Sequence, residues 1–261
     1  ALVSGMGEEA GAWRSLTHYA LFGLAFVPLI WFFVRETGHY EQLRMARGTR
    51  RNWGALAKPF RRPNAKKLIY VSLLKAVLIG GVTSTVSVVE GDFLRVVHGV
   101  DTGVMGRLFQ LDVVAIAGGW IIAGVVSDGI GRHRTLYAFA LIYAVALLAF
   151  ALSPIGSRFV LVAFVAQNFA FAGIFAVLRL ATVELFPTDC RATASAWSDA
   201  FVVLFAAGNI KLVGYLLAEY GGGEAALSLA HILVAAALVV PLVTPLFAAL
   251  PETSRVELAQ E

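Results

Sequence analysis

Long apolar runs, separated by short stretches of charged residues, glycine and proline, make up most of the chain. Seven runs are long enough to cross a bilayer, since a spanning α-helix needs about 20 mostly apolar residues. Within lipid every backbone amide needs an internal partner, and glycine and proline lie mostly between the runs, so helices are favoured over strands. The pattern predicts an all-α membrane protein with about seven transmembrane helices, at Leu16–Val34, Leu68–Val89, Gly103–Val126, Thr135–Leu152, Phe159–Val183, Thr193–Leu217 and Ala225–Leu250.

Composition excludes a water-soluble globule. Hydrophobic residues make up 59% of the 261 and charged residues only 15%, whereas soluble domains are about 25% charged. The chain is also too hydrophobic for a nucleic-acid-binding protein, despite its net charge of +4. Cys190 is the single cysteine, so the chain can form no intramolecular disulfide and no cysteine-based metal cluster. We expect no cofactor and no nucleic-acid partner.

The basic residues are unevenly distributed along the chain. Residues 35–67 hold ten of the 21 lysines and arginines but only two acidic residues, Glu36 and Glu41. By the positive-inside rule this loop is cytoplasmic, so the first helix enters from outside and the C-terminus ends inside. A patch for lipid headgroups or nucleic acid is the alternative. A topology signal that also touches anionic lipid is the favoured interpretation.

A first motif follows the third apolar run, on the predicted cytoplasmic side. It contains Gly124, Asp128, Gly131 and Arg132, with Arg134 two residues later. A helix that stops at a glycine, with an acid and two arginines in one tight turn, can lock to neighbouring helix ends through charge-assisted hydrogen bonds. An ordinary solvated loop is the alternative for this turn taken alone.

A second motif follows the fifth run and reads Glu-Leu-Phe-Pro-Thr-Asp-Cys-Arg at residues 184–191. Pro187 cannot continue a helix, and it biases Phe186 toward extended geometry. We therefore expect Glu184 and Arg191 at the two ends of a short cytoplasmic turn.

Together these motifs resemble the C-terminal half of the major facilitator superfamily, in its sugar-porter, organic-ion and metabolite-proton symporter branches. Members commonly carry G-x-x-x-D-R-x-G-R-R between helices eight and nine and E-L-[FY]-P-T-x-x-R after helix ten. Trp13-Arg14 also resembles the W-R that often opens helix six. The resemblance implies that the seven helices are equivalent to helices 6–12, and that helices one to five are absent.

The same resemblance implies how the chain is divided. Residues 1–34 are the end of the N-terminal bundle, 35–67 the basic central loop, 68–250 the C-terminal six-helix bundle and 251–261 a cytoplasmic tail.

The implied function is secondary active transport of a small polar or charged organic solute by alternating access, with proton coupling expected. The protein would be a multi-pass protein of the cell membrane and not an enzyme. Its partners would be the solute, protons, the lipid bilayer and the missing N-terminal half. A non-transporting membrane receptor or scaffold on the same fold is the alternative. Residues 80–85 lack the paired glutamines and asparagine that sugar porters typically carry there, which argues against a sugar.

The residues that match the two motifs are implied to form a cytoplasmic gate, which holds the outward-facing state. They are Asp128, Arg132, Arg134, Glu184 and Arg191. Gly129 stands where the family usually has a basic residue, and His133 where it has an arginine. We therefore expect a weaker lock than the family's motif would give.

Polar side chains at mid-depth are the candidates for contact with the solute, because the resemblance implies a site near the membrane midplane. Thr83 and Ser84 share a face of small residues, for which helix packing is the alternative. Gln167 and Asn168 are amides that would be costly to leave unpaired within the membrane. Hydrogen bonds to a neighbouring helix are the alternative for these two.

Charged residues inside the runs are costly in lipid and usually face a cavity or a partner. We predict that Asp112 and Lys211 form an ion pair that lines the cavity, and that Asp112 can carry a coupling proton. A purely structural pair is the alternative. We also predict that Arg179 pairs with Asp199, and that the Lys75 amine reaches the membrane interface by snorkelling.

Overall fold

A computed structural model describes residues 53–220 and 225–250, together with residues 24, 26–28, 30–33 and 45, which are helical. The rest of the first predicted helix, Trp13-Arg14, most of the basic loop and the predicted tail lie outside the described residues. The chain divides into two compact units, Ala1–Ala55 and Leu56–Glu261. The second unit holds the transmembrane bundle.

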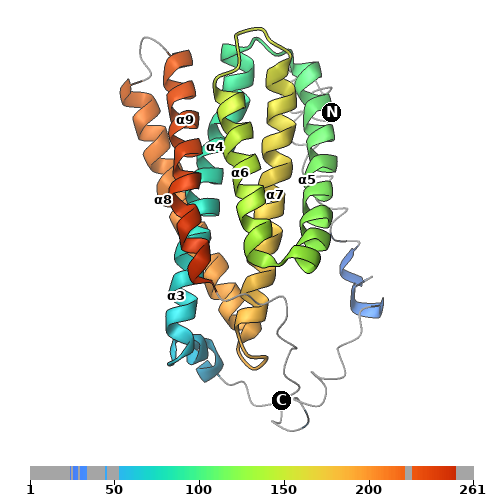
Figure 1. The fold of residues 1–261 in the computed structure, drawn as a ribbon, viewed down its shortest axis with the longest axis vertical. Coiled ribbons are helices and arrows are strands. Elements are labelled where there is room, and N and C mark those ends of the chain that lie inside the picture. The colour runs from blue at the N-terminus through green and yellow to red at the C-terminus, as the bar shows by residue number, and fades with distance from the viewer. Residues whose placement is uncertain are drawn as a thin grey trace. The chain divides into compact units, whose positions relative to one another are not determined.

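The described elements are all helices (Figure 1). In chain order they are the 3-10 helix η1 (Trp53–Phe60), α3 (Asn64–Lys75), the π-helix η2 (Ala76–Thr83), α4 (Ser84–Asp92), the π-helix η3 (Phe93–Val97), α5 (Thr102–Ile130), α6 (Arg132–Ala151), α7 (Phe159–Leu185), α8 (Arg191–Tyr220), α9 (Ala225–Val243) and the 3-10 helix η4 (Thr244–Ala249). Within the described residues, six helical spans are long and apolar enough to cross a membrane. The all-α membrane bundle expected from the sequence is confirmed.

The span that corresponds to the second apolar run is longer than predicted. α3, η2, α4 and η3 join into one helical span, Asn64–Val97, although the apolar run ends at Val89. The additional turns carry Glu90, Asp92 and Arg95, whose charges end the apolar pattern while the backbone stays helical. Glu90 is therefore part of the transmembrane span and not of a loop.

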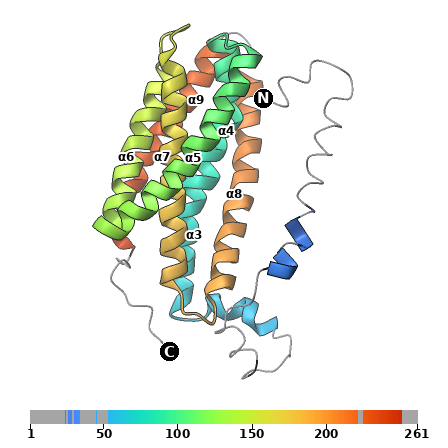
Figure 2. The ribbon, with the colours of Figure 1, turned by 90° about the vertical axis from the view of Figure 1, so that its right-hand side faces the viewer.

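Close helix contacts build the bundle around α7, which packs against both α5 and α6. A Cβ atom added at Gly119 of α5 would lie 2.3 Å from the Phe169 carbonyl oxygen of α7. One added at Gly173 of α7 would lie 2.0 Å from the Phe139 ring of α6. Small residues let membrane helices approach this closely. α6 also contacts α9, while α8 packs against α3 and η2 (Figure 2).

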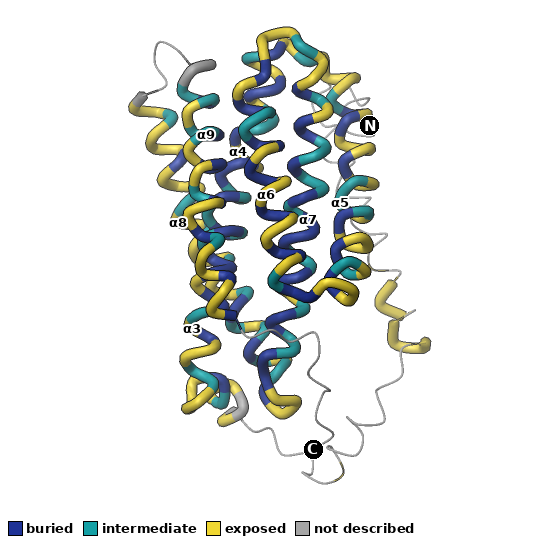
Figure 3. Tube along the Cα trace, viewed as in Figure 1, coloured by how far each residue is buried: buried dark blue, intermediate teal, exposed yellow. Residues whose placement is uncertain are grey.

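The helices differ in how much of their surface the bundle covers (Figure 3). In the most apolar stretches of the span Asn64–Val97 and of α6, 56% of the residues are buried. The corresponding fractions are 17% in α5 and 11% in α8. Most of the apolar surface of α5 and α8 must therefore be covered by lipid or by another protein.

The end of the basic segment docks onto the turn between α7 and α8. Lys58 Nζ lies 2.9 Å from Asp189 Oδ2, and Trp197 Nε1 donates a hydrogen bond to the Leu56 carbonyl at 3.1 Å. η1 and the start of α3 therefore share one end of the bundle with the second motif. We call this the basic end, and the charge distribution predicts that it is cytoplasmic.

Candidate functional site

The first motif forms a tight junction between α5 and α6. Gly131 joins the two helices with a φ of +95°, a left-handed conformation that would strain any residue with a side chain. α5 ends at Ile130 and α6 starts at Arg132, one residue later. The Arg132 side chain therefore lies over the last turn of α5.

Arg132 connects the α5–α6 junction to α7 through its guanidinium group. Nη1 donates to Asp128 Oδ1 at 2.7 Å and to Ser127 Oγ at 3.1 Å. Nη2 donates to Glu184 Oε1 at 2.7 Å, and Nε donates to Glu184 Oε2 at 3.3 Å. The Arg132 side chain is only 8% exposed, so water screens its bidentate ion pair with Glu184 weakly. The contact expected between the two motifs is present, and its role as a gate remains a prediction.

The second motif forms the short turn that was expected between α7 and α8. Phe186 is extended, with φ −111° and ψ 142°, and Arg191 begins α8. Arg191 Nε donates to the Phe186 carbonyl at 3.2 Å, which closes the turn. Neither Arg191 nor the exposed Arg134 forms an ion pair with a described residue. The structure therefore does not join these two arginines to the Arg132 cluster.

The turn also buries the single cysteine. Cys190 is 2% exposed, and its Sγ accepts a hydrogen bond from Asn64 Nδ2 at 3.6 Å. Burial raises the pKa of the Cys190 thiol, and the nearby Asp189 carboxylate raises it further. The protonated thiol thus packs the start of α3 against the turn.

Ser84 lies beside a π-helical segment of the second run, where that run meets α8. Asn209 Nδ2 of α8 lies 2.9 Å from Ser84 Oγ, 2.7 Å from Thr85 Oγ1 and 3.0 Å from the Gly81 carbonyl oxygen. Ser84 Oγ itself donates to the Gly80 carbonyl at 2.5 Å. The Ser84 hydroxyl therefore bonds to its own helix and to α8, and its contact with a solute stays a prediction. Asn209 was not predicted, because one amide within an apolar run leaves no periodic signal.

Thr83 is half-buried at the end of the same π-helical segment. Its hydroxyl donates to the Leu78 carbonyl at 3.2 Å and also interacts with Tyr143 of α6. Thr83 therefore lies inside the bundle, next to the polar groups described below.

Lys75 lies within the bundle, contrary to the prediction that its amine reaches the membrane interface. The residue is 1% exposed, and its Nζ donates to Ser198 Oγ at 3.0 Å and to the Asp199 carboxylate of α8. The predicted pair between Arg179 and Asp199 is also wrong, because Asp199 pairs with Lys75 and Arg179 is exposed. The physical reason is that α3 packs directly on α8, so the amine meets a carboxylate before it reaches water.

A second polar cluster brings together α4, α5 and α7. We call Glu90, Asp112, Gln167 and Asn168 the carboxylate–amide cluster. Gln167 Nε2 donates to Glu90 Oε2 at 3.2 Å. The Asn168 amide interacts with both carboxylates, and the two carboxylates repel each other. Three of the four residues were predicted as candidates, whereas Glu90 was missed because it follows the end of its apolar run.

The predicted ion pair between Asp112 and Lys211 is not formed. Asp112 is 8% exposed and lies within the carboxylate–amide cluster, whereas Lys211 is exposed on α8. Counting residues along a helix indicates depth, but it does not indicate which neighbouring helix a side chain faces. The structure therefore places Lys211 apart from the predicted site.

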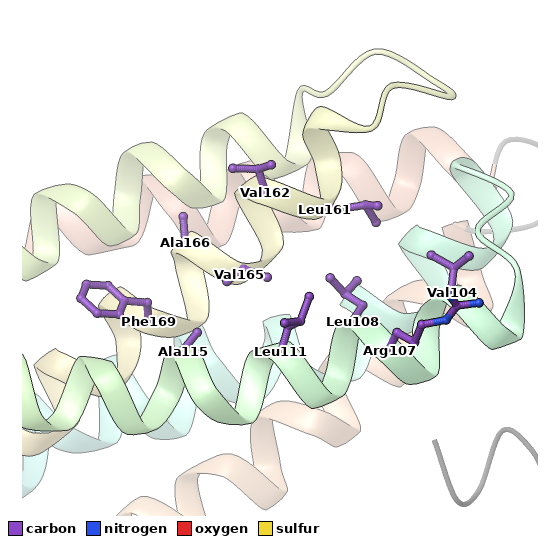
Figure 4. A pocket seen from close by; sticks show the side chains of 10 residues that line it. All are labelled: Val104, Arg107, Leu108, Leu111, Ala115, Leu161, Val162, Val165, Ala166 and Phe169. Atoms are coloured by element: carbon purple, nitrogen blue, oxygen red, sulfur yellow. The ribbon is translucent and has the colours of Figure 1, made fainter.

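A groove of about 520 Å³ runs between α5 and α7 (Figure 4). Arg107 is its one charged lining residue, and the rest of the lining is apolar. The groove therefore suits hydrocarbon better than a polar solute. The lining residues are Val104, Arg107, Leu108, Leu111, Ala115, Leu161, Val162, Val165, Ala166 and Phe169.

Ionisable and polar side chains buried between membrane-spanning helices are characteristic of transport proteins, because such groups are costly in lipid unless they serve a pathway. The family model described as Major Facilitator Superfamily matches residues 1–208. No curated protein matches the chain. The chain therefore belongs to the major facilitator superfamily, a family of multi-pass membrane transporters rather than enzymes.

Proposed function

We propose that this protein is a secondary active transporter of the cell membrane that moves a small polar or charged organic solute by alternating access, coupled to protons. The observation that carries the proposal is the Arg132 contact at the basic end. One guanidinium joins the α5–α6 junction to Glu184 of α7, and we infer that these helix ends rearrange when this side opens. A charge-assisted contact that forms in one state only would bias the equilibrium between the two states.

The polar groups inside the bundle support a polar or charged solute. Asn209 of α8, Lys75 of α3 and the carboxylate–amide cluster all lie between helices rather than on the surface facing lipid. The apolar groove between α5 and α7 supplies no comparable set of donors and acceptors. The solute pathway therefore follows the interhelical polar groups.

The sparsely buried α5 and α8 support a second bundle as partner. Their most apolar stretches are 17% and 11% buried within the described unit. An N-terminal six-helix half packed against these two helices would enclose a path lined by both halves. The full-length protein, with that half present, is the form to assay.

Transport is tested with the full-length protein reconstituted into lipid vesicles. Radiolabelled small carboxylates, amines and polyols are offered separately, with and without an inward proton gradient. We expect uptake of at least one of these probes, increased by the gradient and reduced when a protonophore collapses it. Saturable binding of a probe without any flux would instead identify a receptor or scaffold and contradict the proposal.

A further inference from the structure

The groove between α5 and α7 is separate from the polar groups inside the bundle. Its lining includes no residue of the carboxylate–amide cluster. On each helix most of the lining residues are three or four positions apart, so they share one face of that helix. Val113 and Trp120 are exposed on another face of α5, which remains for the N-terminal half proposed above. The groove can therefore hold a ligand of its own.

The groove is closed at one end and open along its side. Gly119 marks the closed end, because an added Cβ there would lie 2.3 Å from the Phe169 carbonyl oxygen, so the two helices touch. Phe169 lies at this end of the lining, and Arg107 lies toward the other end (Figure 4). Leu111 and Val162 of the lining are exposed, so the groove is open to lipid between its two ends.

The dimensions of the groove suit one acyl chain. Val104 and Ala115, which line it from α5, are 11 positions apart, a rise of about 17 Å in an α-helix. The hydrocarbon of one leaflet is about 15 Å deep, half of the bilayer core. A volume of about 520 Å³ spread over that length gives a mean cross-section of about 30 Å². An α-helix is about 10 Å across and too wide for this space, whereas a single hydrocarbon chain fits it.

The one charge in the lining lies at the level of a lipid headgroup. Arg107 follows Thr102, the first residue of α5, by five positions, which is about 8 Å along the helix. This end of α5 is the one away from the basic end, and a long arginine side chain there can extend to the membrane interface. Arg107 is exposed and forms no ion pair with a described residue. Its guanidinium can therefore bind a phosphate through two parallel hydrogen bonds.

We propose that the groove binds one anionic phospholipid from the leaflet away from the basic end. One acyl chain lies along the apolar lining, and the lipid phosphate accepts hydrogen bonds from Arg107. The lining contains no acidic residue that could pair with the amine of a zwitterionic headgroup. The single positive charge is thus complementary to a headgroup with a net negative charge.

Photocrosslinking in lipid vesicles tests which lipid occupies the groove. The photoreactive residue p-benzoylphenylalanine replaces Val162, which lines the groove, or Val145, an exposed valine of α6 outside it. The full-length protein is reconstituted in phosphatidylcholine with phosphatidylglycerol as the minor lipid. We expect adducts at position 162 to be enriched about fivefold in phosphatidylglycerol, the effect of one arginine near a lipid surface.

Adducts at position 145 should instead match the lipid composition of the vesicles. Equal enrichment at both positions would show a general attraction of anionic lipid to the protein and overturn the proposal. A crosslink from position 162 to another part of the chain would also overturn it, because protein would then cover the groove.

Arginine variants that carry the label at position 162 test the headgroup contact. Arg107→Gln should reduce the enrichment to the value at position 145, because the phosphate loses its partner. Arg158→Gln is the matched control, since it removes an exposed arginine at the same end that does not line the groove. Enrichment should persist in this control. Undiminished enrichment in Arg107→Gln would overturn the proposal.

The contact with the acyl chain is tested in the same assay. Ala166→Phe fills the groove and leaves Arg107 in place, so enrichment should fall here as well. Glycerophosphoglycerol, the headgroup without acyl chains, should not displace the lipid. Persistent enrichment in Ala166→Phe, or full displacement by the free headgroup, would show an anion site without a bound chain and overturn the proposal. No transported solute is used, so the result is independent of the proposed function.

Discussion

Two arginines of the first motif, two positions apart, have different surroundings. Arg132 donates to Ser127, Asp128 and Glu184, whereas Arg134 is exposed and forms no ion pair with a described residue. The motif therefore does not act as a uniform patch of positive charge. Only the planar guanidinium of Arg132 can satisfy Glu184 with two parallel hydrogen bonds.

We predict that Arg132→Lys lowers uptake by about tenfold. A lysine ammonium keeps the positive charge but lacks the planar guanidinium that bonds to Glu184 and Asp128 at the same time. Arg134→Lys is the matched control and should stay within about twofold of the wild type. Initial uptake rates in vesicles measure both. Equal effects of the two substitutions would show that net charge matters here and that the paired geometry does not.

The buried Lys75 provides a second prediction at this scale. Asp199→Asn leaves a buried ammonium with Ser198 as its remaining partner, so we expect a loss of about 3 kcal/mol in the free energy of unfolding. The double variant Lys75→Met/Asp199→Asn also removes the unpaired ammonium and should recover most of the lost stability. Thermal unfolding in detergent compares the two proteins. A double variant no more stable than Asp199→Asn would contradict the assigned pair.

At the scale of helices, the contact between α5 and α7 depends on the absence of a single side chain. A Cβ at Gly119 would lie 2.3 Å from the Phe169 carbonyl oxygen and 3.0 Å from the Ala172 Cβ. The neighbouring Gly118 is not crowded in this way, because its nearest contact would be 3.9 Å away. The two glycines thus form a matched pair on one helix.

Gly119→Ala should destabilise the protein by about 1–3 kcal/mol, since the helices must move apart to admit the methyl group. Gly118→Ala should be neutral, or stabilising by up to about 1 kcal/mol, because alanine favours helix more than glycine does. The midpoint of thermal unfolding in detergent distinguishes them. Similar midpoints for both variants would show that α5 and α7 do not approach as closely as described.

At the scale of the whole molecule, the sequence predicted the course of the chain better than its internal contacts. The apolar runs located the six membrane-spanning helices of the described residues, and Arg132 and Glu184 of the two motifs are in contact. The partners of Lys75 and Asn209 could not be predicted, because helices that are apolar nearly all round do not show which face meets which neighbour. Glu90 was missed for a different reason, since a charge inside a helix looks like the end of a hydrophobic run.

Orientation is the corresponding prediction for the whole molecule. In a Cys190→Ser background, Lys66→Cys should resist a membrane-impermeant maleimide added outside intact cells, whereas Arg158→Cys should react. Both residues are exposed, and they lie respectively at the basic end and in the loop between α6 and α7. Permeabilising the cells should make Lys66→Cys reactive, which verifies that the site is accessible. Reaction of Lys66→Cys in intact cells would invert the assigned topology.

The burial of Cys190 gives the chain a native reporter of conformational change. Its thiol is enclosed where α3 meets the α7–α8 turn, and burial keeps it in the protonated, unreactive form. Alkylation should therefore be slow while the basic end is closed and accelerate when that end separates, most strongly at alkaline pH. The rate of modification at this one sulfur would follow opening and closing in real time, with no residue replaced.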